Sequence, residues 1–465
     1  MVVTPAPGSG LAAPARTWDA LGVFALALLA RLALVAWAHA RFPAVEDGHY
    51  YDVLAHRLAS GEGYTWLWPD GAVTYAAHYP VGYPALLALA YVVFGASPAV
   101  AMTLNALLGA GSAFGAHRLV DGDGVARWRP LAAGLAMALH PALVPYTAAL
   151  MTEGVTAALL VVAAAIANGA RKSDRPWPRI AGAGIVMGVA TLVRPQSLVL
   201  APVLGALGAR AGAGVRARLA RAVAATAVAL ACIAPWTARN CVRMHQCALV
   251  SVNGGWNLLI GAQTRTGGWE PVSVPPECAT VWDEAAKDAC FSQVARRRIG
   301  ASPGGWLARA PGKLGVTFDY FGAAPWYLHA SNPAVFDGRA KVGLGAVETG
   351  ICRLLLLGAL VMCGRLPGKR GLARKAVALA GAVGAVTWHG WIGYLAIVAC
   401  VAFAGRRAVA VAPLAVSAGA AIIAVTAAVH VAFFGAGRYG LVVVPFVTMM
   451  ALSGVMDGRH GPRPS

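Results

Sequence analysis

The chain has 465 residues, of which 58% are hydrophobic and only 12% are charged. Soluble globular proteins are about 45–50% apolar with glycine included, and about 25% charged. This composition excludes a soluble enzyme, a disordered protein and a small disulfide scaffold, and it predicts an all-α membrane protein with many spans. The net charge of +19 does not indicate nucleic-acid binding, because the basic residues cluster in short loops between apolar segments. Such clusters are typical of cytoplasmic loops.

The start of the chain is predicted to cross the membrane once. Residues 1–18, rich in Pro, Ala and Gly, are expected to be a disordered cytoplasmic N-terminus. Residues 19–38 are apolar and long enough to cross a hydrocarbon core of about 30 Å. The run ends at 38–40 in a possible signal-peptidase site, but we favour an uncleaved helix because the run is long and contains Arg31. Both interpretations leave the following acidic loop, residues 39–99, on the outer side.

Within this first outer loop, the apolar run at about 80–95 is interrupted by prolines. We expect it to lie along the outer membrane surface as a juxtamembrane helix. A crossing here would place Arg118, Arg127 and Arg129 outside, against the positive-inside rule. The sequence alone leaves both arrangements open.

About twelve spans are predicted in total, with both termini cytoplasmic. The stretch 180–208 is too long for one span and has Arg194-Pro195 at its middle, so we expect two short helices that meet near the outer face. The large outer loop, residues 239–341, follows the seventh span. The domains are thus the N-terminus, a transmembrane module at 19–238, the large outer loop, C-terminal spans within 342–457 and a cytoplasmic tail at 458–465. The spans are expected near 19–38, 100–119, 130–146, 152–168, 180–208 (two), 218–237, 343–363, 373–389, 390–405, 409–434 and 439–456.

The cysteines divide by predicted location. Those in apolar spans are expected to be buried thiols. The other four lie in the large outer loop, where an oxidising compartment indicates one or two disulfides. Three connectivities are possible for these four: Cys241, Cys247, Cys278 and Cys290. The local pairing joins Cys241 to Cys247 and Cys278 to Cys290, and the sequence does not choose among the three.

No P-loop, dinucleotide-binding or zinc motif occurs in the sequence. The predicted topology instead brings Asp47, Glu153, Arg194 and Arg438 to the outer surface. A charge at the bilayer centre costs at least about 2.5–3.5 kcal/mol, so Glu153 and Arg194 should pair, face a cavity or lie at the interface. Two arginines and two carboxylates suit transfer from a lipid phosphate, since arginine binds phosphate bidentately and a carboxylate can accept the acceptor's proton. A transporter site uses the same groups.

Several short motifs resemble those of the GT-C glycosyltransferases. These membrane enzymes use polyprenyl-phosphate sugars and are related to protein O-mannosyltransferases and to the aminoarabinose transferase of lipid A (glycosyltransferase family 39-like). The motifs are Glu46–Tyr51 with its continuation to Tyr64, His78–Pro84 ("PPGYP"), Met151–Glu153 ("TE"), Arg194-Pro195 ("RP"), Pro235–Asn240 ("PWxxRN") continued at Ser251–Asn257, and Gly437–Tyr439 with Pro445 ("RY…P"). The resemblance covers residues 20–260 and, loosely, the last two spans. Residues 262–340 match no known pattern and are expected to carry acceptor specificity.

This resemblance implies a GT-C fold and an inverting transfer of a hexosyl or pentosyl group. The donor would be a sugar on a polyprenyl phosphate such as undecaprenyl phosphate, and the acceptor an extracytoplasmic glycan, lipid or protein. It implies that Asp47 deprotonates the acceptor and that Glu153 orients the acceptor or supports Asp47. Arg194 and Arg438 would bind the donor phosphate, with His78 as a further candidate.

Other residues are candidates for the substrate or lipid groove. They are Glu46, Tyr50, Tyr83, Tyr439, Arg239 and Asn240. Simpler roles are also open: Glu46 as a solvated loop residue, Tyr83 as an anchor of the juxtamembrane helix, and Arg239-Asn240 as a helix cap that holds the large outer loop. Some relatives of this group need a divalent metal. Here the only obvious ligands are Asp47 and Glu153, so we predict no metal and no cofactor.

The sequence thus predicts a cell-envelope glycosyltransferase of the bacterial inner membrane, with its site facing the periplasm. Its partners would be membrane lipids, a lipid-linked sugar donor and an extracytoplasmic acceptor. The alternative is a secondary transporter or lipid flippase. Transporters usually show paired broken helices in repeated halves, whereas one broken segment, at Arg194-Pro195, is predicted here. A protein of the same fold without catalysis is a third possibility, which the presence of Asp47 and Arg438 disfavours.

Overall fold

The structure, a computed structural model, describes residues 12–121, 125–368 and 370–453. The tail predicted at 458–465 and residues 1–11 of the predicted N-terminal segment lie outside these ranges. The regular secondary structure of the described part is almost entirely helical. Its two strands, β1 (Thr65–Leu67) and β2 (Val73–Tyr75), form one antiparallel hairpin. The predicted all-α class is confirmed.

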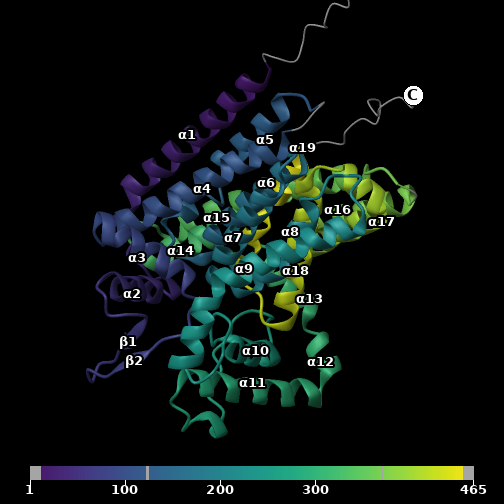
Figure 1. Ribbon diagram of the computed structural model, residues 1–465. Coiled ribbons are helices and arrows are strands. Elements are labelled where there is room, and N and C mark those ends of the chain that lie inside the picture. Colours follow the sequence, from purple (N-terminus) through teal and green to yellow (C-terminus); the bar gives the residue numbers. More distant parts are fainter. Residues whose placement is uncertain (1–11, 122–124, 369, 454–465) are drawn as a thin grey trace, which may run out of the picture.

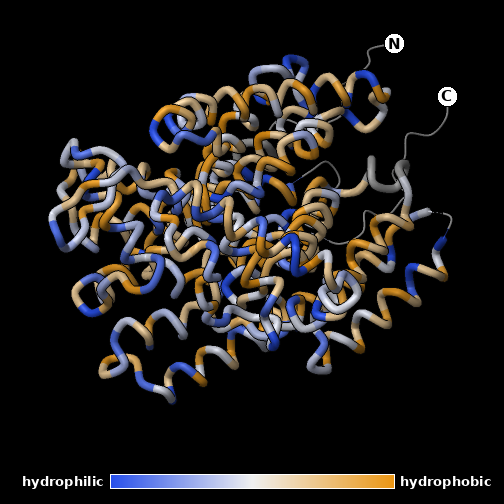
Figure 2. The backbone as a smooth tube through the Cα atoms, turned by 90° about the horizontal axis from the view of Figure 1, so that it is seen from below, coloured by the Kyte–Doolittle hydropathy of each residue, from blue (hydrophilic) through white to orange (hydrophobic). Residues whose placement is uncertain are grey.

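Six described helices are long and apolar enough to cross a membrane. Together with the composition, they make the chain an integral membrane protein. These helices are α1 (Ala12–Ala38, apolar from Arg16), α4 (Pro98–Val120), α6 (Thr152–Arg171), α9 (Val215–Arg243), α15 (Gly338–Gly364) and α18 (Leu414–Ala432). In Figure 2, hydrophobic residues recur along helices in every part of the molecule.

Shorter helices complete the bundle. They are α3 (Gly82–Phe94), α5 (Trp128–Ala138), α7 (Trp177–Val193), α8 (Leu200–Leu207), α16 (Gly371–Val386), α17 (Gly390–Val411) and α19 (Val444–Ser453). Each predicted span contains one helix of these two sets, and α3 is the predicted juxtamembrane helix. With 13 residues, α3 rises only about 20 Å, less than the thickness of the hydrocarbon core.

The outer loops contain their own helices. Figure 1 shows α10, α11 and α12 of the large outer loop beyond one end of the bundle, on the side away from both ends of the described chain, with α2 and the β-hairpin near the same end. The bounds are α2 (Asp47–Ala59), α10 (Gly254–Gln263), α11 (Glu284–Ala301), α12 (Pro303–Leu307), α13 (Ala310–Phe318) and α14 (Ala323–Ser331). Four 3-10 turns are η1 (Pro145–Ala148), η2 (Pro195–Val199), η3 (Pro276–Cys278) and η4 (Gly437–Val442).

Several predicted boundaries are wrong. The first helix starts at Ala12 rather than 19, because alanine favours helix and Pro14 is tolerated in a first turn. The span predicted at 130–146 ends at Ala138, ahead of two prolines. In contrast, α9 continues to Arg243, five residues into the segment predicted as loop.

Two further differences concern the C-terminal half. The backbone of α17 leaves helical geometry at Gly405 (φ 78°), and α18 begins only after Pro413, so the span predicted at 409–434 starts later. The span predicted at 439–456 is preceded by η4, and α19 begins at Val444 with Pro445 in its first turn. Proline at the first positions of a helix loses no hydrogen bond. Because η4 contains Arg438, this residue lies in a turn ahead of the last helix.

Candidate active site

Four charged side chains from distant parts of the chain meet in one cluster. Arg438 donates through Nη2 to Oδ2 of Asp47 at 2.7 Å, and its Nε lies 3.5 Å from Oε1 of Glu153. Arg194 donates through Nη2 to the same Glu153 oxygen at 2.8 Å. The cluster holds two negative and two positive charges, which makes it a chain of ion pairs running from Asp47 to Arg194.

Each residue of the cluster lies at the start or end of a helix or in a short 3-10 turn. Asp47 and Glu153 lie in the first turns of α2 and α6, where the helix dipole stabilises a carboxylate. Arg194 lies where α7 gives way to η2, because proline at the next position cannot continue the helix. Arg438 lies in η4. The predicted meeting of two short helices at Arg194 is present in the structure.

The start of α2 is held unusually close to its neighbour. Glu46, which precedes the helix, has a positive φ of 53°, a conformation that is rare for a residue with a side chain. At Gly48, a Cβ atom would lie 2.9 Å from the carbonyl oxygen of Leu150 and 2.9 Å from the Tyr327 hydroxyl. Only glycine therefore lets α2 approach the segment that leads into Glu153.

Two tyrosines complete the polar network. Tyr146 donates to Oε2 of Glu153 at 2.8 Å, and Tyr79 donates to Oδ1 of Asp47 at 3.2 Å. Burial, reinforced by the nearby Asp47 carboxylate, raises the pKa of the Tyr79 phenol. Tyr79 therefore stays protonated at physiological pH and acts as a donor to Asp47.

The cluster is graded in accessibility. The Glu153 side chain is only 1% exposed, whereas that of Arg438 is 24% and that of Asp47 32% exposed. The Tyr439 ring lies against both guanidinium groups, 4.9 Å from Arg194 and 5.2 Å from Arg438. Glu153 is thus placed to hold the arginines, while Asp47 and Arg438 remain open to a ligand.

A small pocket of about 20 Å³ has Arg194 in its lining. The other polar residues of the lining are Thr156, Gln196, Ser197, Thr426, His430 and Tyr439. The apolar lining consists of Leu160, Leu200, Ile422, Val425, Val429 and Val442. The pocket therefore places one guanidinium group beside a largely apolar lining.

The remaining predicted groove residues lie outside the cluster. The His78 ring is edge-on to Tyr79 at 5.0 Å and contacts neither arginine of the cluster. Tyr50 is 46% exposed and stacks on the same Tyr79 ring. Tyr83 is fully buried and bonds to Asn105, so it does not line an open groove.

Arg239 and Asn240 donate hydrogen bonds to backbone carbonyl groups and do not belong to the charge cluster. Arg239 donates to the carbonyl oxygens of Ala76 and Tyr64, at 2.8 and 2.9 Å. Asn240 is buried and donates to Ala248 and Val250. These contacts match the simpler role of fixing the large outer loop, and they leave neither side chain free to line a groove.

The four outer cysteines form two disulfides. Cys241 pairs with Cys247, and Cys278 pairs with Cys290. Of the three possible connectivities, this is the local one. The second bond closes a loop around the start of α11.

Metal ligands are sparse in the described part of the chain. No group of three or more His, Cys, Asp or Glu side chains gathers there. Asp47 and Glu153 both face Arg438. The expectation that no metal is needed remains a prediction.

Some residues of the site carry no signal of their own in the sequence. Tyr79 lies inside the motif at 78–84, but nothing there shows that its hydroxyl reaches Asp47. Tyr146 precedes Glu153 by seven residues, and its role depends on the irregular turn η1. Glu284 bonds to the first outer loop from more than 200 residues away. These contacts follow from tertiary structure, so a linear pattern does not reveal them.

The fold and the charge cluster together define a helical integral membrane protein with a polar site where its helices end. Neither a protein-family model nor a curated protein matches the sequence. Among solved structures, the chain is similar to the archaeal oligosaccharyltransferase AglB from Archaeoglobus fulgidus in complex with an inhibitory peptide and a dolichol-phosphate. The identity is 15% over 94% of this chain and 50% of that chain, with a TM-score of 0.45.

The chain is also similar to ArnT from Cupriavidus metallidurans bound to undecaprenyl phosphate. Here the identity is 14% over 94% of this chain and 78% of that chain, with a TM-score of 0.39. The chain spans about half the length of the archaeal enzyme. Both solved proteins are GT-C glycosyltransferases, the class that the sequence motifs resemble.

Proposed function

We propose that this protein is an inverting GT-C glycosyltransferase that moves a sugar from a polyprenyl phosphate to an extracytoplasmic acceptor. The observation that carries the proposal is the cluster itself, in which an accessible carboxylate, Asp47, is paired with Arg438, and Glu153 holds Arg438 beside a second arginine, Arg194. The two guanidinium groups suit the phosphate of an anionic lipid headgroup. The acceptor then reaches Asp47 from the open side.

The chemistry follows from these positions. Arg194 and Arg438 hold the donor phosphate through N–H groups that their carboxylate partners leave free. Asp47 takes the proton of an acceptor hydroxyl or amine, and the freed oxygen or nitrogen attacks the anomeric carbon. The bond from that carbon to the phosphate oxygen breaks, and the lipid phosphate leaves as an anion. The leaving group needs no strong acid, because the guanidinium groups stabilise the charge as it forms.

Glu153 has a positioning role in this proposal. It is almost fully buried and pairs with both arginines, so it suits holding the cations better than contacting an acceptor. The site would face the periplasm from the bacterial inner membrane, with undecaprenyl phosphate as the carrier lipid. The large outer loop would supply acceptor specificity.

The experiment is sugar transfer in proteoliposomes. Wild-type protein, Asp47→Asn and the control Asp70→Asn would receive radiolabelled polyprenyl-phosphate sugars and a membrane extract as acceptor. Asp70 lies in the turn between β1 and β2, where its carboxylate accepts from the Ala72 amide, away from the cluster. We expect wild type and Asp70→Asn to form a labelled product, and Asp47→Asn to be slower by about 100-fold or more. Donor that crosses the bilayer unchanged, with no new product, would instead identify a flippase.

A further inference from the structure

The large outer loop bonds directly to the segment of the first outer loop that leads from β2 to Tyr79. The Glu284 carboxylate, at the start of α11, makes the contact. Its Oε2 accepts hydrogen bonds from the backbone amides of Ala77 and His78, at 2.7 and 3.0 Å. Its Oε1 accepts from the Trp66 indole at 2.6 Å. One side chain thus joins α11 to the hairpin and to the residue next to Tyr79.

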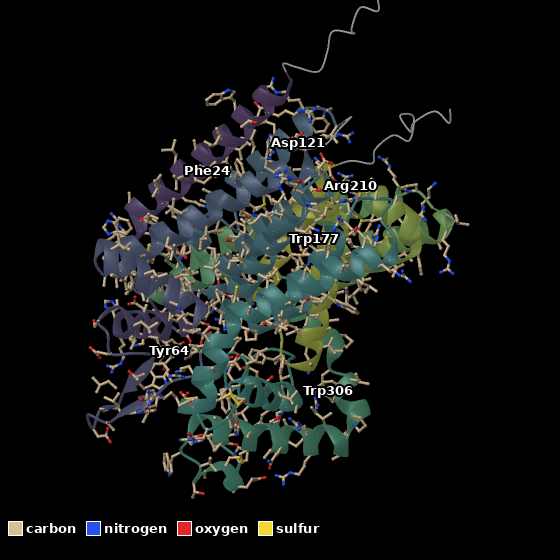
Figure 3. All side chains as sticks on the ribbon, viewed as in Figure 1. Phe24, Tyr64, Asp121, Trp177, Arg210 and Trp306 are labelled. Carbon is tan, nitrogen blue, oxygen red and sulfur yellow. A yellow bond between two sulfur atoms is a disulfide. The ribbon has the colours of Figure 1, made fainter. Side chains whose placement is uncertain are left out.

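Tyr79 passes this constraint to the cluster. Its hydroxyl donates to Asp47, its carbonyl oxygen accepts from the Tyr64 hydroxyl at 2.8 Å, and its ring stacks on Tyr50. Figure 3 shows Tyr64 beside the end of α9. The backbone and the ring of Tyr79 are thus both held where its hydroxyl reaches Asp47.

Other contacts also hold this irregular segment in place. The Val252 amide donates to the carbonyl of Ala77, and Arg239 donates to the carbonyl of Ala76. Ala76 and Ala77 are fully buried. Glu284 and Arg239 are the charged members of this set, and hydrogen bonds that involve an ionised group are about twice as strong as neutral ones.

The start of α11 is itself anchored. The Cys278–Cys290 disulfide closes a loop that contains Glu284, and Cys278 is fully buried. Asp283 caps the helix by accepting from the Ala286 amide. Glu284 is therefore held on a rigid element of the large outer loop.

We propose that Glu284 is a positioning residue for glycosyl transfer, which acts by fixing the Ala77–His78 backbone and thereby the Tyr79 hydroxyl that holds Asp47. The proposal rests on the proposed function of the cluster. It makes the large outer loop part of the machinery that orients the base, in addition to any contact with the acceptor.

The first test needs no catalytic activity. Amide hydrogen exchange would be measured on peptides covering residues 76–79 in wild type, Glu284→Gln and the control Glu277→Gln. Glu277 pairs with Arg297 on the same loop and does not contact the first outer loop. We expect exchange in this segment to be about 10-fold faster in Glu284→Gln and unchanged in Glu277→Gln. Unchanged exchange in Glu284→Gln would overturn the proposal even if the enzyme were active.

The second test is a double-mutant cycle with Tyr79→Phe. If Glu284 acts through Tyr79, Glu284→Gln should lower kcat about 10- to 100-fold in the wild-type background, with little change in the KM for the donor. In the Tyr79→Phe background it should lower kcat by much less, because the orientation it maintains is already lost. A purely structural role for Glu284 predicts additive effects, and additivity would overturn the proposal.

A third variant covers loss of folding. If Glu284→Gln does not yield monodisperse protein, Glu284→Asp keeps the charge but retracts it by one methylene group. It should give intermediate exchange and intermediate kcat, and wild-type values for both would overturn the proposal. Wild-type protein that transfers no sugar, with the exchange result as expected, would reject the proposed function while leaving the structural contact in place.

Discussion

Arg438 is the residue on which the cluster depends, because it is the cation that faces both carboxylates. A lysine keeps the charge, but its single ammonium group cannot span Asp47 and Glu153 and also bind phosphate. We expect Arg438→Lys to lower transfer about 100-fold. The measurement is kcat/KM for the donor, with Arg297→Lys as the control at an ion pair that is more than half exposed on the arginine side. Near-normal transfer by Arg438→Lys would show that the phosphate is held elsewhere.

We expect the loss of the Glu153 charge to lower the stability of the fold as well as the rate of transfer. Its carboxylate is 1% exposed and accepts from Arg194 and Tyr146. Removing one partner of a buried ion pair costs roughly 3 kcal/mol, because the remaining charge is left without compensation. Glu153→Gln should therefore lower the apparent unfolding temperature in detergent.

The matched control is Glu62→Gln, at the pair between Arg57 and a Glu62 side chain that is 50% exposed. Pairs of this kind contribute about 1 kcal/mol or less. Equal destabilisation by the two substitutions would contradict the assignment of Glu153 as the buried anchor of the arginines.

At the scale of elements, the approach of α2 to the start of α6 decides where Asp47 lies. An added methyl group at Gly48 would meet backbone at Leu150, which cannot move as a side chain can. We expect Gly48→Ala to displace the start of α2 and to lower kcat by about 10-fold or more. Gly22→Ala is the control, since a Cβ there meets nothing within 4 Å. Gly48→Ala with wild-type kcat would show that this close approach does not position the base.

The elements also show what the sequence can and cannot predict. The lengths of the apolar runs predicted where the helices of the bundle lie. Pro195 predicted the interruption between α7 and α8, at which Arg194 is found. The convergence of Asp47, Glu153, Arg194 and Arg438 followed from counting spans. Helix ends were less predictable, because prolines that stop α5 or begin α19 act through local geometry that span length does not capture. The bonds of Tyr79 and Glu284 join segments far apart in the chain, so they required the folded structure.

At the scale of the whole molecule, the large outer loop contacts both sides of the site. Glu284 accepts from the Ala77 amide, in the segment that leads to Tyr79. On the other side, the carbonyl of Gly267 accepts from the amide of Gly435, three residues before Arg438. The turn at Gly267 is held by Glu270, whose carboxylate accepts from the amides of Arg265 and Thr266 and from two threonine hydroxyls. The two loops and the last helices therefore form one frame around the cluster.

The Glu270 turn gives this frame a predicted pH dependence. Hydrogen bonds from Thr266 lower the pKa of Glu270 from 4.5 to about 2. A carboxyl with a depressed folded-state pKa contributes stability that is present above pH 4.5 and is lost as the pH falls toward 2. Glu270→Gln should thus unfold at a lower temperature than wild type at neutral pH, and the gap should close between about pH 4.5 and 2. A gap that does not change with pH would contradict the role of the charge.

The most direct test of the mechanism is the anomeric configuration of the product. Donor of known configuration would be turned over by wild-type protein in proteoliposomes, and the glycosidic bond of the isolated product would be assigned by NMR. A single displacement by an acceptor that Asp47 has deprotonated predicts the opposite configuration from the donor, with the product lost in Asp47→Asn. Retention of configuration would contradict the account, because it requires a covalent glycosyl-enzyme intermediate or two successive displacements.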